Sequence, residues 1–110
     1  MEKTLIVARM VPGSEQDIAS VFAASDATEL PLRIGVRSRT LFRFHDLYMH
    51  LIEAEQPLNA TVDGQREDPL FREVSKNLSP FVSAYDPDTW RAPSDAMAKA
   101  FYRWQNPGQP

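Results

Sequence analysis

Residues 33–54 alternate between two kinds of side chain over most of their length, and no other feature restricts the fold as strongly. A period of two places successive side chains on opposite faces of a β-strand. The pattern is interrupted once, at His45-Asp46. We therefore predict two antiparallel strands, Arg33–Phe44 and Leu47–Ala54, joined by a hairpin turn at those two residues.

The turn also fixes which residues face one another across the hairpin. If Phe44 and Leu47 flank it, then Leu41 faces His50 and Arg43 faces Tyr48. One face is nearly all apolar and carries Ile34, Val36, Phe42, Phe44, Leu47, Met49 and Leu51. The other face is mixed and carries Arg33, Arg37, Arg39, Leu41, Arg43, Tyr48, His50 and Ile52. Since neither face suits bulk water, we expect helices to cover one and a second copy of the chain to cover the other, in a homodimer.

The segment before the hairpin predicts a strand and a helix. Residues 3–11 are rich in aliphatic side chains and end at the breaker pair Pro12-Gly13. Ser14 then opens a helix to about Ser25, with Ser14 and Asp17 in the spacing of a capping box. The following residues, 26–31, connect this helix to the hairpin.

The segment after the hairpin predicts a helix and a last strand. A weakly helical stretch runs from Pro57 to about Gln65. Asp68-Pro69 then supplies an N-cap and a proline at the first helical position of a helix that ends before Pro80. Met97–Trp104 is the expected last strand. The order strand, helix, strand, strand, helix, strand is typical of a ferredoxin-like α+β fold, βαββαβ, with a four-stranded antiparallel sheet and the helices on one face.

Length and composition indicate one domain over residues 1–110. The 12 basic and 15 acidic side chains give a net charge of -3, which argues against nucleic acid or an anionic membrane as a partner. The absence of cysteine removes disulfides and thiolate chemistry, and no stretch approaches the ~20 apolar residues of a membrane span. We expect a soluble, cytoplasmic protein.

No motif in the sequence indicates a cofactor. Four glycines, none in a nucleotide-binding pattern, leave no glycine-rich phosphate cradle. His45 and His50 are the only histidines, and the alternation places them on opposite faces, so we expect no metal site. His45 lies in the predicted turn, where a polar residue is expected in any case.

Arg39 and His50 are the pair on the mixed face that could share a ligand. They are diagonal neighbours across the hairpin, roughly 7 to 8 Å apart at the backbone. A face of this kind under helices that do not fill it would form an apolar pocket with a few convergent polar groups. The alternative is that Arg39 is one of several solvated arginines and His50 a hydrogen-bonded histidine of the sheet. From spacing alone, this alternative ranks ahead of catalysis.

Further candidates lie around this face. Asp26 and Glu29 follow the first predicted helix, where carboxylates are often simply solvated. Tyr102 and Trp104 share one face of the predicted last strand and could wall an aromatic pocket, although core packing is at least as common. The residues expected to contact a substrate are Ser25, Glu29, Arg37, Leu41, Tyr48, Ile52, Tyr102 and Trp104.

Three stretches resemble the small aromatic-polyketide cyclases of bacterial type II synthase clusters, the tetracenomycin-type cyclase family. They are TELPLRIGVRSRTLFRFHDLYMHLIEA (Thr28–Ala54), DPLFREV (Asp68–Val74) and FYRW (Phe101–Trp104). The resemblance covers nearly the whole chain. It implies a dimeric α/β-barrel fold, similar to that of cofactor-free monooxygenases. It also implies ring closure of an aromatic polyketide intermediate in antibiotic biosynthesis, with no cofactor and transient contact with synthase components.

The same resemblance implies that Asp26, Arg39 and His50 are catalytic. The best-known member is expected to carry a histidine before that aspartate, where this chain has Ser25. In an intramolecular aldol closure, His50 suits the acid/base role because the reference pKa of histidine is about 6.5, and Arg39 would lower it. Arg39 would hold the enolate oxygen, and Asp26 would orient the imidazole or a substrate hydroxyl. Two alternatives stay open: cofactor-independent oxygenation of a phenol, and a non-catalytic partner that shields a reactive ketide.

Overall fold

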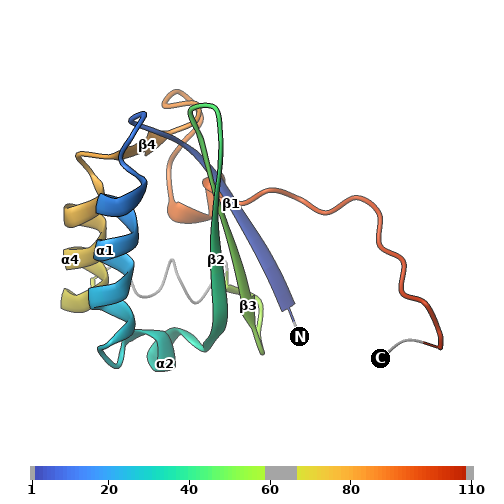
Figure 1. Cartoon of the computed structure of the whole chain (residues 1–110). Helices are drawn as coiled ribbons and strands as arrows, with labels where there is room; N and C mark the ends of the chain where they lie inside the picture. Colours follow the sequence, from blue (N-terminus) through green and yellow to red (C-terminus); the bar gives the residue numbers. More distant parts are fainter. Residues whose placement is uncertain (1, 59–66, 109–110) are drawn as a thin grey trace.

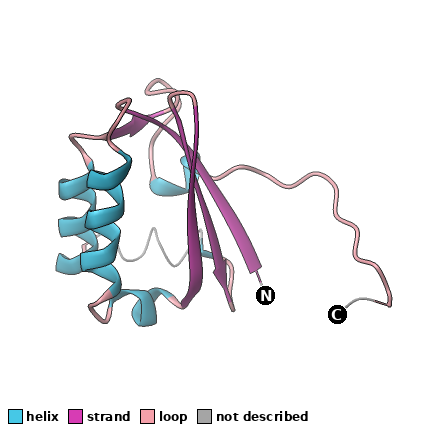
Figure 2. Ribbon diagram, in the orientation of Figure 1, coloured by secondary structure: helices cyan, strands magenta, loops and turns pink. Residues whose placement is uncertain are grey.

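The computed structural model describes residues 2–58 and 67–108. Its elements are β1 (Glu2–Met10), α1 (Glu15–Asp26), α2 (Leu30–Ile34), β2 (Val36–Phe44), β3 (Leu47–Ala54), α4 (Pro69–Leu78), β4 (Val82–Ala84) and the 3-10 turn η1 (Pro93–Ala96). The strands form one antiparallel sheet in the order β2-β3-β1-β4, and α1 and α4 lie side by side on one side of it (Figures 1 and 2). This is the ferredoxin-like α+β arrangement that the sequence predicted. No helix in the described part of the chain is long and apolar enough to cross a membrane.

The central hairpin has the predicted register. Leu41 pairs with His50, and Arg43 pairs with Tyr48. His45 in the turn has a φ of 56°, a left-handed conformation that histidine adopts more readily than most residues. The register shifts between Val36 and Ser38. Because a shift of one residue exchanges the two faces, Val36 lies on the helix-covered side rather than on the apolar face where we expected it.

The start of the second strand and the first helix cap were predicted wrongly. Residues 30–34 form the helix α2, which ends at Gly35 with a φ of 86°, so the strand begins at Val36 and Ile34 lies outside the sheet. The hydroxyl of Ser14 donates to the Val11 carbonyl at 2.6 Å, and its side chain does not cap α1. The hydroxyl therefore stabilises the turn before the helix instead of closing a capping box with Asp17.

The C-terminal half contains one confirmed and one wrong prediction. Asp68 caps α4 by accepting from the Leu70 amide at 2.8 Å, as predicted. The last strand is β4, not Met97–Trp104, because β4 follows α4 directly and takes the edge of β1 at Ala8–Met10. Met97 makes only an isolated bridge with Ile6, and the residues after it extend away from the body (Figure 1). Most of the stretch predicted from Pro57 to Gln65 lies outside the described residues.

Burial along β3 shows which face of the sheet the helices cover. Tyr48, His50 and Ile52 are buried, whereas the alternate residues of β3 are only half-buried. The core is accordingly on the helix side and contains Ala8, Met10, Ile18, Phe22 and Tyr48, with a second cluster of Ile52, Ala54 and Leu58. The covered face is therefore the mixed one. The apolar face is open, and Phe42 and Phe44 on it are 51% and 60% exposed.

Candidate functional site

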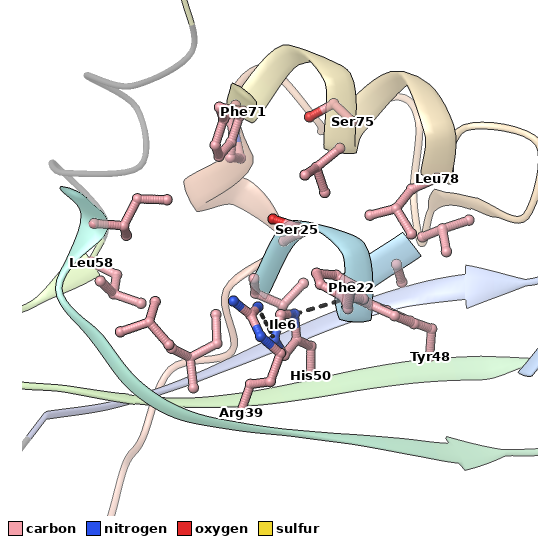
Figure 3. A pocket seen from close by; sticks show the side chains of 18 of the residues that line it. Ile6, Phe22, Ser25, Arg39, Tyr48, His50, Leu58, Phe71, Ser75 and Leu78 are labelled. Carbon is pink, nitrogen blue, oxygen red and sulfur yellow. Dashed lines mark hydrogen bonds between the residues drawn. The ribbon is translucent and has the colours of Figure 1, made fainter. Parts of the chain in front are cut away.

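A cavity of about 420 Å³ lies between the mixed face of the sheet and the helices. Its volume is within the range of small-molecule sites. The sheet contributes Ile6, Ala8, Arg39, Tyr48, His50 and Ile52, and the helices contribute Phe22, Ser25, Leu30, Phe71, Val74, Ser75 and Leu78 (Figure 3). Most of this lining is apolar, so the few polar groups on the sheet side dominate the electrostatics of the cavity.

Arg39 connects these polar groups. Its Nη2 and Nε donate to the two carboxylate oxygens of Asp26 at 2.7 and 3.0 Å, and its Nη1 lies 3.1 Å from His50 Nε2. The guanidinium carbon also lies 4.9 Å from the centre of the Phe22 ring. A guanidinium group has five N–H donors, of which these contacts use three. The two remaining N–H groups can serve a ligand.

Both ring nitrogens of His50 have partners. Nε2 faces Arg39, and Nδ1 lies 3.1 Å from the hydroxyl of Tyr48. The residue is 3% exposed, with Phe22 against its ring edge at 4.9 Å between centroids. Burial, and then the charge of Arg39, lowers the pKa of His50 to about 3. The predicted direction is confirmed, with burial as the larger cause, and the imidazole is neutral at any physiological pH.

Asp26 contacts a different group from the one expected. It was expected to orient the imidazole or a substrate hydroxyl, but its two oxygens are taken by Arg39. A carboxylate that accepts from two N–H groups of one guanidinium fixes the plane of that group. Asp26 at the end of α1 therefore sets the orientation of Arg39 and reaches His50 only through it.

Ser25 lies next to Asp26 and points into the cavity. It is 7% exposed, and its hydroxyl has no hydrogen-bond partner among the described residues. A buried hydroxyl without a partner is unfavourable by about 1 to 3 kcal/mol. The position thus provides a polar group that a ligand oxygen could satisfy.

The remaining predicted contacts divide into two groups. Tyr48 and Ile52 line the cavity, as expected for substrate contacts. Leu41 packs against the core cluster instead, Glu29 pairs with Arg33, and Arg37 pairs with Glu55. Tyr102 and Trp104 are 80% and 67% exposed on the extended segment, because the strand that would have placed them at the cavity does not form.

Sequence reasoning missed one wall of the cavity. Val82, Ser83 and Ala84 of β4 line it, together with Trp90, Pro93 and Ala96 from the segment that follows. The helical spacing of Phe71, Val74 and Leu78 could have identified the α4 wall, since it predicts one apolar face. Nothing in the local pattern around Trp90 indicates that this loop returns to the cavity.

No metal site is evident in residues 2–58 and 67–108, where no three side chains of His, Asp or Glu come together. The polar groups that line the cavity include the Arg39 guanidinium, the neutral His50 imidazole, the Tyr48 phenol and the Ser25 hydroxyl, and Arg39 is held by the Asp26 carboxylate, which is not part of the lining. This set can bind and polarise carbonyl oxygens through its donors, and Nε2 of the imidazole can accept a proton.

The chain is similar to known proteins over nearly its whole length. The sequence profile of a family described as polyketide synthesis cyclase matches residues 2–105. An uncharacterized protein of Streptomyces coelicolor is 56% identical over 106 residues, which are 96% of each chain. Polyketide synthase CurG of Streptomyces cyaneus is 50% identical, over 96% of this chain and 98% of that protein.

The tetracenomycin F2 cyclase of Streptomyces glaucescens is 46% identical, over 96% of this chain and 95% of that protein. Its solved structure, described as that of a type-II polyketide cyclase, matches with a TM-score of 0.90 at 45% identity, over 97% of this chain and 100% of that one. The profile match and the relatives cover nearly the whole chain. The chain therefore belongs to the polyketide synthesis cyclase family.

Proposed function

We propose that this polyketide cyclase directs the intramolecular aldol closure of a poly-β-ketone chain in aromatic polyketide biosynthesis, without a cofactor. The observation that carries the proposal is the position of Arg39 and the neutral His50 on one wall of a largely apolar cavity. An aldol closure needs a proton to leave a carbon between two carbonyl groups. It also needs a donor for the enolate oxygen and a proton for the alkoxide before water is lost.

Arg39 is the group we assign to the enolate oxygen. It is held by Asp26 in one orientation, is only 16% exposed and has two N–H groups free. Donors fixed in advance in a site of low polarity stabilise developing negative charge more than water does, typically by about 3 to 4 kcal/mol per donor removed. Asp26 is then a positioning residue that acts through Arg39.

His50 is the group we assign to proton removal. With a pKa of about 3 in the free protein it is a weak base, because a positive imidazolium would be buried beside Arg39. For Nε2 to accept the proton from carbon, the Nη1 N–H of Arg39 has to turn from Nε2 to the substrate oxygen, in addition to the two N–H groups that are already free. The enolate that forms there also brings the negative charge that an imidazolium needs. Substrate binding thus frees the base and strengthens it in the same step.

The apolar walls contribute by holding one folded form of the chain. A poly-β-ketone can close in several ways, and a cavity that fits one conformer raises the effective concentration of the corresponding pair of reacting carbons. Phe71, Val74 and Leu78 of α4 face the polar wall across the cavity. We assign them to the regiochemistry of closure rather than to its chemical steps.

The open face of the sheet supports a homodimer in which this face meets the same face of a second copy. Phe42 and Phe44 on it are half-exposed, and the half-buried residues of β3 lie beside them. Contiguous apolar surface of this kind usually marks an interface. Transient contact with synthase components and a cytoplasmic location stay predictions from the sequence.

The test is to add the purified chain to a minimal type II synthase and compare the products. We expect one ring pattern to become dominant. A rise in total yield with unchanged ring patterns would instead favour the non-catalytic partner. Consumption of dioxygen in proportion to product would favour oxygenation of a phenol. Either result would overturn the aldol assignment.

A further inference from the structure

The direction of the hydrogen bond between Arg39 and His50 implies that the Tyr48 hydroxyl has a proton it can donate to a ligand. A guanidinium group only donates, so His50 Nε2, at 3.1 Å from Arg39 Nη1, must accept. A neutral imidazole that accepts at one nitrogen carries its proton on the other. His50 Nδ1 therefore donates to the Tyr48 hydroxyl oxygen at 3.1 Å. The opposite tautomer would place two donors head to head.

The Tyr48 hydroxyl accepts this bond and keeps its own proton. No other side chain in the described ranges bonds to it. Tyr48 lines the cavity from β3, in a row with His50 and Arg39 along the sheet side (Figure 3). A phenol that accepts one hydrogen bond still has an O–H group to donate, and a ligand oxygen in the cavity is the acceptor that the site offers.

We infer that Tyr48 is a further catalytic residue, which donates its hydroxyl proton to the alkoxide oxygen created by ring closure. The inference rests on the proposed function and gives its last proton transfer a named donor. Arg39 then serves the enolate oxygen at one end of the row. Tyr48 serves the oxygen of the attacked carbonyl at the other end, and His50 lies between them.

The atoms and protons of this step balance. Ring closure forms a C–C bond and moves the electron pair of one C=O bond onto its oxygen, which takes the Tyr48 proton. The phenolate takes the proton from His50 Nδ1, while Nε2 holds the proton removed from carbon. One C–H bond is broken and one O–H bond is formed. His50 ends neutral with its proton on Nε2, and exchange with water restores the starting tautomer.

The electrostatics of Tyr48 fit a donor rather than a base. Burial raises the pKa of Tyr48, although the charge of Arg39 opposes the shift. The phenol therefore stays protonated throughout the working range of the protein. Because an aliphatic alkoxide is a stronger base than a phenolate, the transfer to the new alcohol is favourable.

Nitrogen NMR of the wild-type chain tests the hydrogen-bond directions without any substrate. We expect His50 to carry its proton on Nδ1 from about pH 5 to pH 8, and we expect Tyr48→Phe to shift this N–H signal. A proton on Nε2 would mean that Tyr48 donates to His50 and has none free. That result would overturn the inference and leave the proposed function standing.

Ring closure of the chains delivered by a minimal type II synthase tests the chemistry. Tyr48→Phe should lower the rate about 100-fold with product affinity changed by less than about threefold. Tyr85→Phe removes a hydroxyl from an exposed tyrosine outside the cavity and should leave the rate unchanged. Fluorinated tyrosines of lower pKa at position 48 should change the rate in a graded way, which a packing role would not produce.

A failure of the Tyr48 role and a failure of the cyclase function give different results. If the wild-type chain closes the ring and Tyr48→Phe does so equally fast, the role of Tyr48 is wrong and the cyclase proposal stands. If the wild-type chain closes no ring, the proposed function fails and the inference fails with it.

Discussion

The two faces of the sheet are made from the same alternating strands, yet the more polar face is the one that the helices bury. On β3, Tyr48, His50 and Ile52 are buried, whereas the residues between them are half-buried and open. Hydrophobicity alone would favour the reverse arrangement, because the open face is nearly all apolar. Something other than apolar area decides which face receives the helices.

The covered face and α1 are complementary in charge. Arg39 pairs with Asp26 at the end of α1, and Arg43 pairs with Glu15 at its start. Two arginines on one face of β2 thus meet two carboxylates of the helix that covers them. The apolar face is thus left exposed, whereas the mixed face lines the cavity and carries its charged groups.

The strongest loss of activity is expected from a substitution of Arg39 on the covered face. Arg39→Ala removes the donors for the enolate and should lower the rate of ring closure 100- to 1,000-fold, corresponding to about 3 to 4 kcal/mol. The matched control is Arg43→Ala, which removes an arginine of the same face paired with the same helix but outside the cavity. Equal losses in both variants, measured as initial rates with thermal melting as a folding check, would reduce Arg39 to a structural role.

The second prediction concerns Phe44 on the open face and the association of two copies of the chain. If this face forms a symmetric dimer interface, Phe44→Ala removes the side chain from both copies and should weaken association about 100-fold, or about 3 kcal/mol. Sedimentation over a range of concentrations measures the change. Leu32→Ala, at an exposed position on α2, is the control and should not alter association. A wild-type chain that stays monomeric at every concentration contradicts the proposed dimer.

The third prediction concerns the pH dependence of stability, to which the buried His50 of the covered face contributes. The pKa of His50 is about 3 in the folded chain and about 6.5 when unfolded, so below pH 6.5 the unfolded state binds the extra proton. Stability should therefore fall as the pH falls from about 6.5 toward 3, by about 2 kcal/mol between pH 7 and pH 5.

Urea unfolding of the wild type and of His50→Gln at each pH isolates this contribution as a difference between the two. His45→Gln, in the exposed turn, should follow the wild type over the same range. Parallel pH curves for the wild type and His50→Gln would show that His50 is not held neutral by the fold.

Long, regular patterns predicted the fold well. The alternation along the hairpin set its register, and Asp68-Pro69 marked the start of α4. β4 was missed because a three-residue strand is too short for a periodic signal and follows directly after a helix. The aromatic residues of 101–104 mimic a strand, but β4 already occupies part of the β1 edge.

Only the part of the site that lies on the central hairpin could be predicted from the sequence. The register alone brought Arg39 and His50 to one face, and they are in contact. The pairing of Asp26 with Arg39 depends on where α1 crosses the sheet, which no local pattern specifies. The hydrogen-bond directions at Tyr48 follow from three side chains together, so they could be assigned only with coordinates.

The smallest expected effect concerns Ser25, the cavity residue that adjoins the Asp26–Arg39 pair. Its buried hydroxyl lacks a partner in the described ranges, so Ser25→Ala should leave the stability of the free protein unchanged or raise it by up to about 1 kcal/mol. If a substrate oxygen bonds to this hydroxyl, the same variant should weaken product binding about fivefold, which is about 1 kcal/mol. Calorimetric titration with the purified product measures the affinity, and Ser20→Ala on the exposed side of α1 is the control. A Ser25→Ala variant that loses stability but not affinity would place this hydroxyl in the structure of the covered face rather than in substrate binding.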